Sequence, residues 1–279
     1  MKSRIVYIHD MNTIIAPVDF SDASTNAVSF AAEISKRSSA RLIIVNVLHA
    51  DGDEDEAKKQ LKYLESDLKK SIAPNFECES LIAHGNLVDA LKKIIKVQQP
   101  DLIVMGTKGA SGLKKLLIGS NTVNVISKTK VPVLVIPEVA RFKDFFMKGK
   151  NRIVLATDLD SLENEGALDI LKVIALLIIE PKLRVLSVRS KNADLTSGKR
   201  KERDFLLSVF KPEIETERVT IFSDSVIGGI NFYLNQRKED TGLVAMIARD
   251  SGHLIQKHYT REMASHTHLP LLVLHDSKI

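Results

Sequence analysis

The amino-acid sequence predicts an α/β protein built from two tandem domains, each with a five-stranded parallel sheet. Apolar runs of strand length alternate with segments of helical period, which is the pattern of a parallel sheet covered by helices. The same unit also occurs twice. Residues 14–19 are matched by residues 153–158, at an offset of 139 (158 − 19), and residues 131–136 by residues 269–274, at an offset of 138 (270 − 132).

A third pair of segments, residues 101–105 and 242–246, has an offset of 141 (242 − 101). Three similar offsets of about half the chain indicate an internal duplication. The predicted domains are therefore residues 1–140 and 152–279, joined by a charged linker at residues 141–151.

Each element of the first half follows from its residues. The strands are expected at residues 13–19, 41–48, 76–83, 101–105 and 132–136. Ser21 or Asp22 can cap the helix after the first strand, and the acidic run 51–56 favours the start of a second helix. A third helix is expected over residues 87–98. The second half repeats this order, with strands near residues 152–157, 182–188, 214–222, 243–247 and 271–274.

Composition excludes several classes of protein. A formal charge of +5 is too small to indicate a nucleic-acid partner, and the single cysteine excludes an internal disulfide. Apolar stretches fall short of the roughly 20 residues that span a bilayer, and the N-terminus lacks the apolar segment of a signal peptide. We expect a cytoplasmic protein without membrane or nucleic-acid partners.

The glycine-rich segment 105–122 carries the chemistry. It begins at the carboxyl end of a buried strand and ends at the start of a helix, where parallel sheets bind ligands. Glycines allow close approach of the backbone, and free N–H groups at the helix start favour an anion such as a phosphate. The alternative is that the glycines only shape a surface loop and cap the helix.

Gly106-x-x-Gly109, nine residues and then Gly119-Ser120 resemble the phosphate loop of the ATP-binding branch of the universal stress protein family. The segments 16–21, 45–47, 84–86, 100–106 and 131–135 are similar to that family in the same order. The resemblance covers the first half. It implies Rossmann-like, adenine nucleotide alpha hydrolase-like domains that pair through their last strands, with Val133 and Leu271 at the junction and possible further homodimers.

The resemblance also implies roles for individual residues. Asp19 would meet the ribose or a magnesium-phosphate group, unless it only caps a helix, and the Val47 backbone would meet adenine. Lys108 would contact the phosphates, or remain an ordinary exposed loop lysine. The full implied set for ATP or AMP is Pro17, Val18, Asp19, Val47, Met105, Gly106, Lys108, Gly109, Gly119, Ser120, Asn121 and Thr122.

The second half departs from this pattern. Ile247 and Asp250 replace the first two glycines, and a β-branched side chain and an added carboxylate both oppose phosphate binding. We therefore expect no nucleotide there. His266 and His268 lie two residues apart, which does not place them on one helix face, so they are interpreted as solvated rather than zinc-binding.

Motifs of P-loop enzymes, dehydrogenases and serine hydrolases are absent from the sequence, so a dedicated catalyst is not expected. The leading hypothesis is a stress-response sensor or regulator that binds ATP or AMP in its first half. The alternatives are a slow magnesium-dependent ATPase or phosphotransferase that uses Asp19, and a scaffold for a protein or small ligand in which the glycine loop is structural.

Overall fold

The computed structural model describes residues 11–50, 52–72, 76–107, 120–142, 145, 149–191, 194–249 and 269–276. Its strands are β1 (Thr13–Val18), β2 (Arg41–Leu48), β3 (Cys78–His84), β4 (Leu102–Thr107), β5 (Val133–Pro137), β6 (Arg152–Ala156), β7 (Lys182–Arg189), β8 (Glu215–Phe222), β9 (Thr241–Arg249) and β10 (Leu271–Asp276). Its helices are α1 (Asp22–Ser38), α2 (Glu54–Ser71), α3 (Leu87–Gln98), α4 (Ser120–Lys128), η1 (Glu165–Leu168), α6 (Asp169–Leu176), α7 (Ser197–Val209) and α8 (Val226–Gln236).

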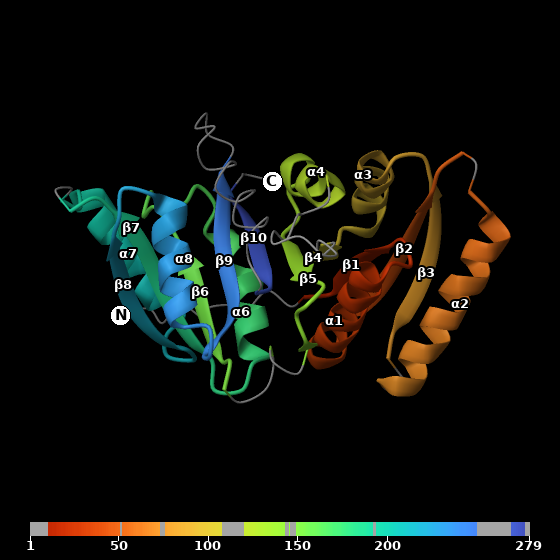
Figure 1. Cartoon of the computed structure of the whole chain (residues 1–279), viewed down its shortest axis with the longest axis horizontal. Helices are drawn as coiled ribbons and strands as arrows, with labels where there is room; N and C mark the ends of the chain where they lie inside the picture. The colour runs from red at the N-terminus through yellow and green to blue at the C-terminus, as the bar shows by residue number, and fades with distance from the viewer. Residues whose placement is uncertain are drawn as a thin grey trace, which may run out of the picture.

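All strands join one sheet in the order β3-β2-β1-β4-β5-β10-β9-β6-β7-β8. Every pair within a half is parallel, and the pair β5–β10 that joins the halves is antiparallel. In Figure 1 the two halves lie side by side and meet at these two strands. The predicted fold class is confirmed, including pairing through the last strands; the domain boundaries remain a prediction.

The junction between the halves is symmetric. Leu134 pairs with Leu272 at its centre, with Val133 opposite Val273 and Val135 opposite Leu271. All of these side chains are buried. Val133 and Leu271 lie at the junction as expected, and the strand that would be an exposed edge in each half is covered by the other half.

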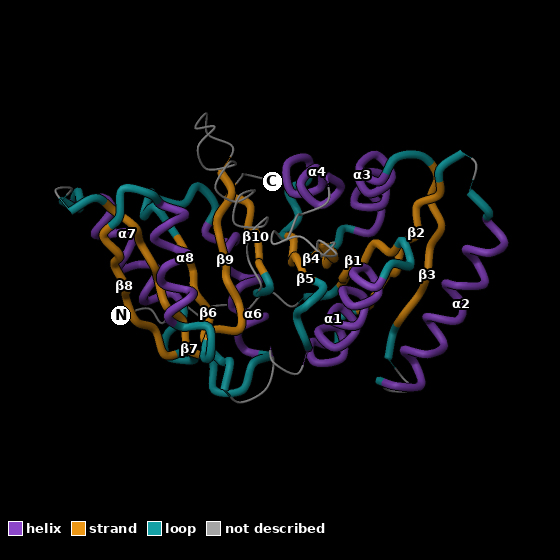
Figure 2. The backbone as a smooth tube through the Cα atoms, in the orientation of Figure 1, coloured by secondary structure: helices purple, strands orange, loops and turns teal. Residues whose placement is uncertain are grey.

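Helices cover both faces of the sheet, as the purple helices beside the orange strands show (Figure 2). One buried apolar cluster unites side chains of α1 and α2 with those of α6 and α7, and therefore continues from the first half into the second. A second cluster on the opposite face contains side chains of α3, α4 and α8. In the described residues, no helix is long and apolar enough to cross a membrane.

Side chains cap the helices that surround the carboxyl edge of the first half. Ser21, rather than Asp22, is the N-cap of α1, and Asp53 in the acidic run accepts the backbone N–H groups of Asp55 and Glu56 at the start of α2. Asn86 caps α3, whose bounds agree with the predicted residues 87–98. These caps satisfy N–H groups that have no partner inside the helix.

The segment after β5 packs against α1 and is more than a charged spacer. Phe145 is 1% exposed, and the centroid of its ring lies 5.9 Å from the centroid of the Phe30 ring. The centroid of the Phe142 ring lies 5.5 Å from that of Phe30, and the side-chain amide of Asn26 donates to the Ala140 carbonyl at 3.2 Å. The linker therefore contributes aromatic side chains to the core, which its charged sequence obscured.

Candidate functional site

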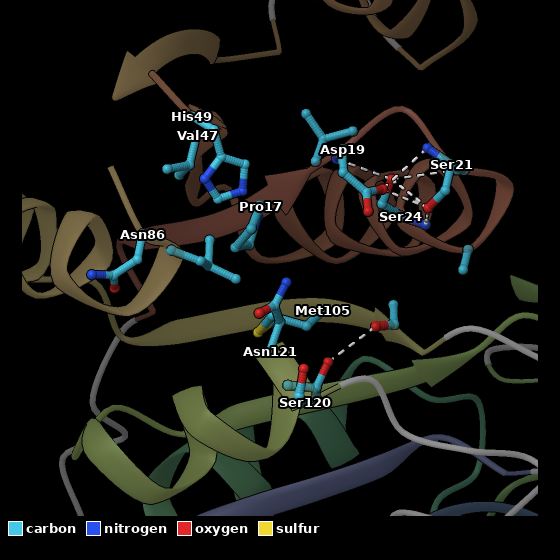
Figure 3. A pocket seen from close by; sticks show the side chains of 15 residues that line it. Pro17, Asp19, Ser21, Ser24, Val47, His49, Asn86, Met105, Ser120 and Asn121 are labelled. Atoms are coloured by element: carbon cyan, nitrogen blue, oxygen red, sulfur yellow. Dashed lines mark hydrogen bonds between the residues drawn. The ribbon is translucent and has the colours of Figure 1, made fainter. Parts of the chain in front are cut away.

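A cavity of about 530 Å³ lies where the carboxyl ends of β1, β2 and β4 meet the first turns of α1, α3 and α4. Strand β1 pairs with both β2 and β4, so the chain leaves adjacent strands in opposite directions at this point. Such a reversal opens a crevice at the carboxyl edge of a parallel sheet, and ligands bind there. Figure 3 shows the side chains that surround the cavity.

The structure brings together most of the residues predicted to bind a ligand. Those that line the cavity are Pro17, Val18, Asp19, Val47, Met105, Gly106, Ser120, Asn121 and Thr122. Lys108, Gly109 and Gly119 lie outside the described residues. Whether any of these residues binds a nucleotide remains a prediction.

A network of hydroxyl groups fixes the carboxylate of Asp19 on one side of the cavity. Its Oδ1 accepts the Ser21 hydroxyl at 2.5 Å and the Ser21 N–H at 3.1 Å. The Ser24 hydroxyl accepts the backbone N–H of Asp19 at 3.2 Å and donates to the Ser21 carbonyl at 3.0 Å. The carboxylate is thus positioned beside the N-terminus of α1, although Ser21 is the residue that caps the helix.

Gly106 lets strand β4 and helix α1 approach one another. A Cβ atom at this position would lie 2.2 Å from the Ala23 carbonyl oxygen, a distance that no real contact reaches. Thr122, 2% exposed, donates its hydroxyl to the Gly106 carbonyl at 3.2 Å and ties the first turn of α4 to the same point. Packing alone therefore requires a glycine at position 106.

The opposite end of the cavity is formed by the end of β2 and the start of α3. The amide of Asn46 is buried and donates to the Val18 carbonyl at 2.8 Å, which holds β1 and β2 in place beneath the site. Val47 and Leu87 give this end an apolar surface, and His49 adds an imidazole ring. Figure 3 shows the His49 ring and the Asn121 amide approaching the cavity from different elements.

Three helix N-termini lie at the rim of the cavity. The first turns of α1, α3 and α4 each bring the positive end of a helix dipole there, and Ser21 and Asn86 cap the first two of these helices. In the described part of the chain, no group of three His, Cys, Asp or Glu side chains forms a metal site. The arrangement suits a ligand with one apolar planar part and one anionic part.

Sequence reasoning did not assign several of the residues that line the cavity. They are Ser21, Ala23, Ser24, His49, Asn86 and Leu87. Each follows the end of a strand or begins a helix, and the sequence marked Ser21 as a possible cap and Asn86 only within the family-like segment 84–86. The available signal was position: the chain just past β1, β2 and β3 reaches the same edge of the sheet.

Comparisons with known proteins agree with this geometry. The model of the Universal stress protein family matches residues 11–137. Universal stress protein Rv1636 of Mycobacterium tuberculosis is 30% identical over 141 residues, which are 44% of this chain and 94% of that protein. Universal stress protein YxiE of Bacillus subtilis is 28% identical over 145 residues, 45% of this chain and 98% of that protein.

A solved structure extends the likeness in fold to both halves. The crystal structure of a universal stress protein from Archaeoglobus fulgidus has a TM-score of 0.74 and 20% sequence identity. It covers 96% of this chain and 100% of its own. The match shows that both halves share their fold with this protein.

Proposed function

Because the chain belongs to the universal stress protein family, we propose that its first half binds ATP or AMP and that occupancy of this site makes the protein a stress-response sensor or regulator. The observation that carries the proposal is the cavity at the reversal point of the sheet, where three helix N-termini converge. An apolar end and a positive end in one cavity match the base and the phosphates of a nucleotide.

The lining suggests how the nucleotide is oriented. The adenine base would lie at the apolar end near Pro17, Val47 and Met105, with the Val47 backbone reading its edge. The ribose would lie beside Asp19, which the Ser21 hydroxyl already orients. The phosphates would meet the start of α4 at Ser120 and Asn121, where N–H groups favour negative charge, with magnesium neutralising the remainder.

Binding without turnover fits the described side chains better than catalysis. Among the described residues that line the cavity, Asp19 supplies the carboxylate, and its Oδ1 already accepts two hydrogen bonds from Ser21. The competing hypothesis is a slow magnesium-dependent ATPase or phosphotransferase with Asp19 as its base. Multiple turnovers of phosphate release that disappear in Asp19→Asn would favour this enzyme over the sensor.

The first test is calorimetric titration of the purified protein with ATP, AMP and adenosine, beside thermal unfolding with the same ligands. A ligand that binds only the folded state stabilises it by about 2.7 kcal/mol at a hundredfold excess over Kd. We expect binding and a higher unfolding midpoint with ATP or AMP. Absence of both would refute nucleotide binding and favour the scaffold in which the glycine loop is structural.

A matched pair of variants tests the position of the phosphates. Asn121 and Asn124 are both exposed on α4, but only Asn121 lines the cavity. Asn121→Asp places a carboxylate beside the proposed phosphate position. It should lower the affinity for ATP about tenfold or more, the affinity for AMP less and the affinity for adenosine least. Asn124→Asp adds the same charge one turn away and should change affinity little. Equal effects of the two substitutions would exclude phosphate at this helix start.

A further inference from the structure

The register of the strands places the second half's counterpart of the cavity around Arg249. Ile15 pairs with Ile103 between β1 and β4, and Val154 pairs with Val244 between β6 and β9. These pairs are related by offsets of 139 (154 − 15) and 141 (244 − 103). The first offset takes Asp19 to Asp158, and the second takes Lys108 to Arg249.

Arg249 is turned inward, with a side chain only 8% exposed. Its Nη1 donates to the Ser161 carbonyl at 2.6 Å, and its Nη2 donates to the Asp160 carbonyl at 2.5 Å. The same guanidinium forms ion pairs with Asp158 at 3.6 Å and with Asp276 at 3.3 Å. One side chain thus joins the end of β9 to the loop after β6 and to the end of β10.

Asp276 extends this connection. Its side chain is 1% exposed, and its Oδ1 accepts the backbone N–H groups of Glu163 and Asn164, each at 2.8 Å. Lys199 of α7 adds a second cation, donating to the Asp158 carbonyl at 2.9 Å. In the first half the corresponding segment begins α1 directly after Ser21, whereas here η1 begins only at Glu165.

The charges explain why Arg249 must stay in place. Burial raises the pKa of Asp158 above its ordinary value, with the nearby Arg249 opposing that rise. Buried carboxylates without a cation are strongly unfavourable, and a guanidinium is suited to reach two carboxylates and two carbonyls at once. An arriving anionic ligand would meet these carboxylates and a guanidinium whose Nη1 and Nη2 already donate to backbone carbonyls.

We propose that Arg249 makes the two halves inequivalent, because its guanidinium occupies the place that a ligand would take in the second half. The guanidinium fills the strand-end position beside Asp158 and holds loop 157–164 against β9 and β10. It thereby excludes a nucleotide from this half. The ion cluster formed by Arg249, Asp158 and Asp276 then needs no ligand to complete it. This inference holds whether or not the first half binds a nucleotide.

Hydrogen–deuterium exchange of the full chain tests the proposal, read at the amides of Glu163 and Asn164. In Arg249→Ala we expect these amides to exchange at least about tenfold faster, because the loop opens locally. The exchange rate in Arg249→Lys should be intermediate, since the lysine ammonium keeps the positive charge but lacks the planar set of N–H donors of a guanidinium. The control is Arg218→Ala, an exposed arginine of β8 in the same half, which should leave both amides unchanged.

Chemical rescue separates a specific occupant from general loss of packing. Low concentrations of methylguanidinium should restore slow exchange in Arg249→Ala, and equal concentrations of sodium chloride or urea should not. Should Arg249→Ala fail to fold, the comparison between the wild-type chain and Arg249→Lys still tests the role of the planar guanidinium donors. Unchanged exchange of the two amides in Arg249→Ala would overturn the proposal, and so would rescue by sodium chloride alone. If Arg249→Ala does not fold, unchanged exchange in Arg249→Lys would overturn it.

Discussion

Phe20 and Leu159 lie 139 residues apart (159 − 20) and share one left-handed backbone conformation, each with φ of 61°. Non-glycine residues rarely adopt this conformation, and it carries a cost of order 1–3 kcal/mol. Each follows a strand-end aspartate, Asp19 or Asp158. The duplicated halves have kept the path of the backbone at this edge while the side chains beyond it diverged toward an open cavity in one half and an ion cluster in the other.

The contact between Gly106 and Ala23 predicts a clear effect on stability. Gly106→Ala forces its Cβ against the backbone of α1, which cannot move as a flexible side chain would. We expect the free energy of unfolding to fall by about 1–3 kcal/mol, as for other overpacked sites. Urea denaturation of the variant without ligand measures this change.

Gly198 provides the matched control. It lies in the first turn of α7, where the nearest atom to an added Cβ would be the Thr196 hydroxyl oxygen at 3.9 Å. Gly198→Ala should leave stability unchanged or raise it by up to about 1 kcal/mol, because alanine favours the helix. Equal stabilities of the two alanine variants would mean that α1 can shift away from β4.

The aromatic contacts of the linker predict that it is part of the folded core. Phe145→Ala removes a buried ring and its edge-to-face contact with Phe30, so we expect a loss of about 3–5 kcal/mol. Phe232→Ala, at a phenylalanine that is 58% exposed on α8, should change stability by no more than about 0.5 kcal/mol. Thermal unfolding compares them. A similar small effect of both substitutions would show that the linker, residues 141–151, only connects the halves.

The fold was predictable because backbone periodicity is a local property. The repeated strands, the cap of α1 and the bounds of α3 follow from short patterns, whereas the junction at Val133 and Leu271 was expected from the family resemblance. The ends of β9 were less predictable: the expected residues 243–247 became Thr241–Arg249, because buried polar residues at both ends continue the pairing.

The site was predictable only in part. Residues in and beside the glycine-rich segment were assigned through the family resemblance, but His49 reaches the cavity only because β2 lies beside β1 in space. The inward turn of Arg249 depends on Asp276, which is separated from it by 27 residues (276 − 249). Such pairings between distant segments leave no periodic signal in the chain.

Glu202 predicts a pH dependence of stability. Burial raises the pKa of its carboxyl above the ordinary value, so the folded chain holds this proton more tightly than the unfolded chain does. That contribution is present below the unfolded pKa of about 4.3 and is lost as the pH rises through the higher folded pKa. At neutral pH the buried carboxylate therefore weakens the fold.

Glu202→Gln should accordingly raise the free energy of unfolding at pH 7, and the gain should vanish below about pH 4, where Glu202 is protonated in both states. Urea denaturation across this range measures it. Glu239→Gln, at a side chain that is 86% exposed, is the control and should show no such trend. A variant less stable than the wild type at pH 7 would mean that attraction between Glu202 and Arg249 outweighs the effect of burial.

His49 predicts which part of the proposed nucleotide lies near β2. Its imidazole lines the cavity at the end that also contains Val47 and Leu87, opposite Asn121. A base stacked on a ring of this kind gains about 1–3 kcal/mol, so His49→Ala should weaken ATP, AMP and adenosine alike, by roughly tenfold. His49→Phe should retain most of the affinity if stacking is the cause. His84→Ala is the control, because His84 ends the neighbouring strand β3 and pairs with Glu54 outside the cavity. Calorimetric titration distinguishes the outcomes: a loss confined to ATP would place the phosphates, rather than the base, beside His49 and reverse the proposed orientation.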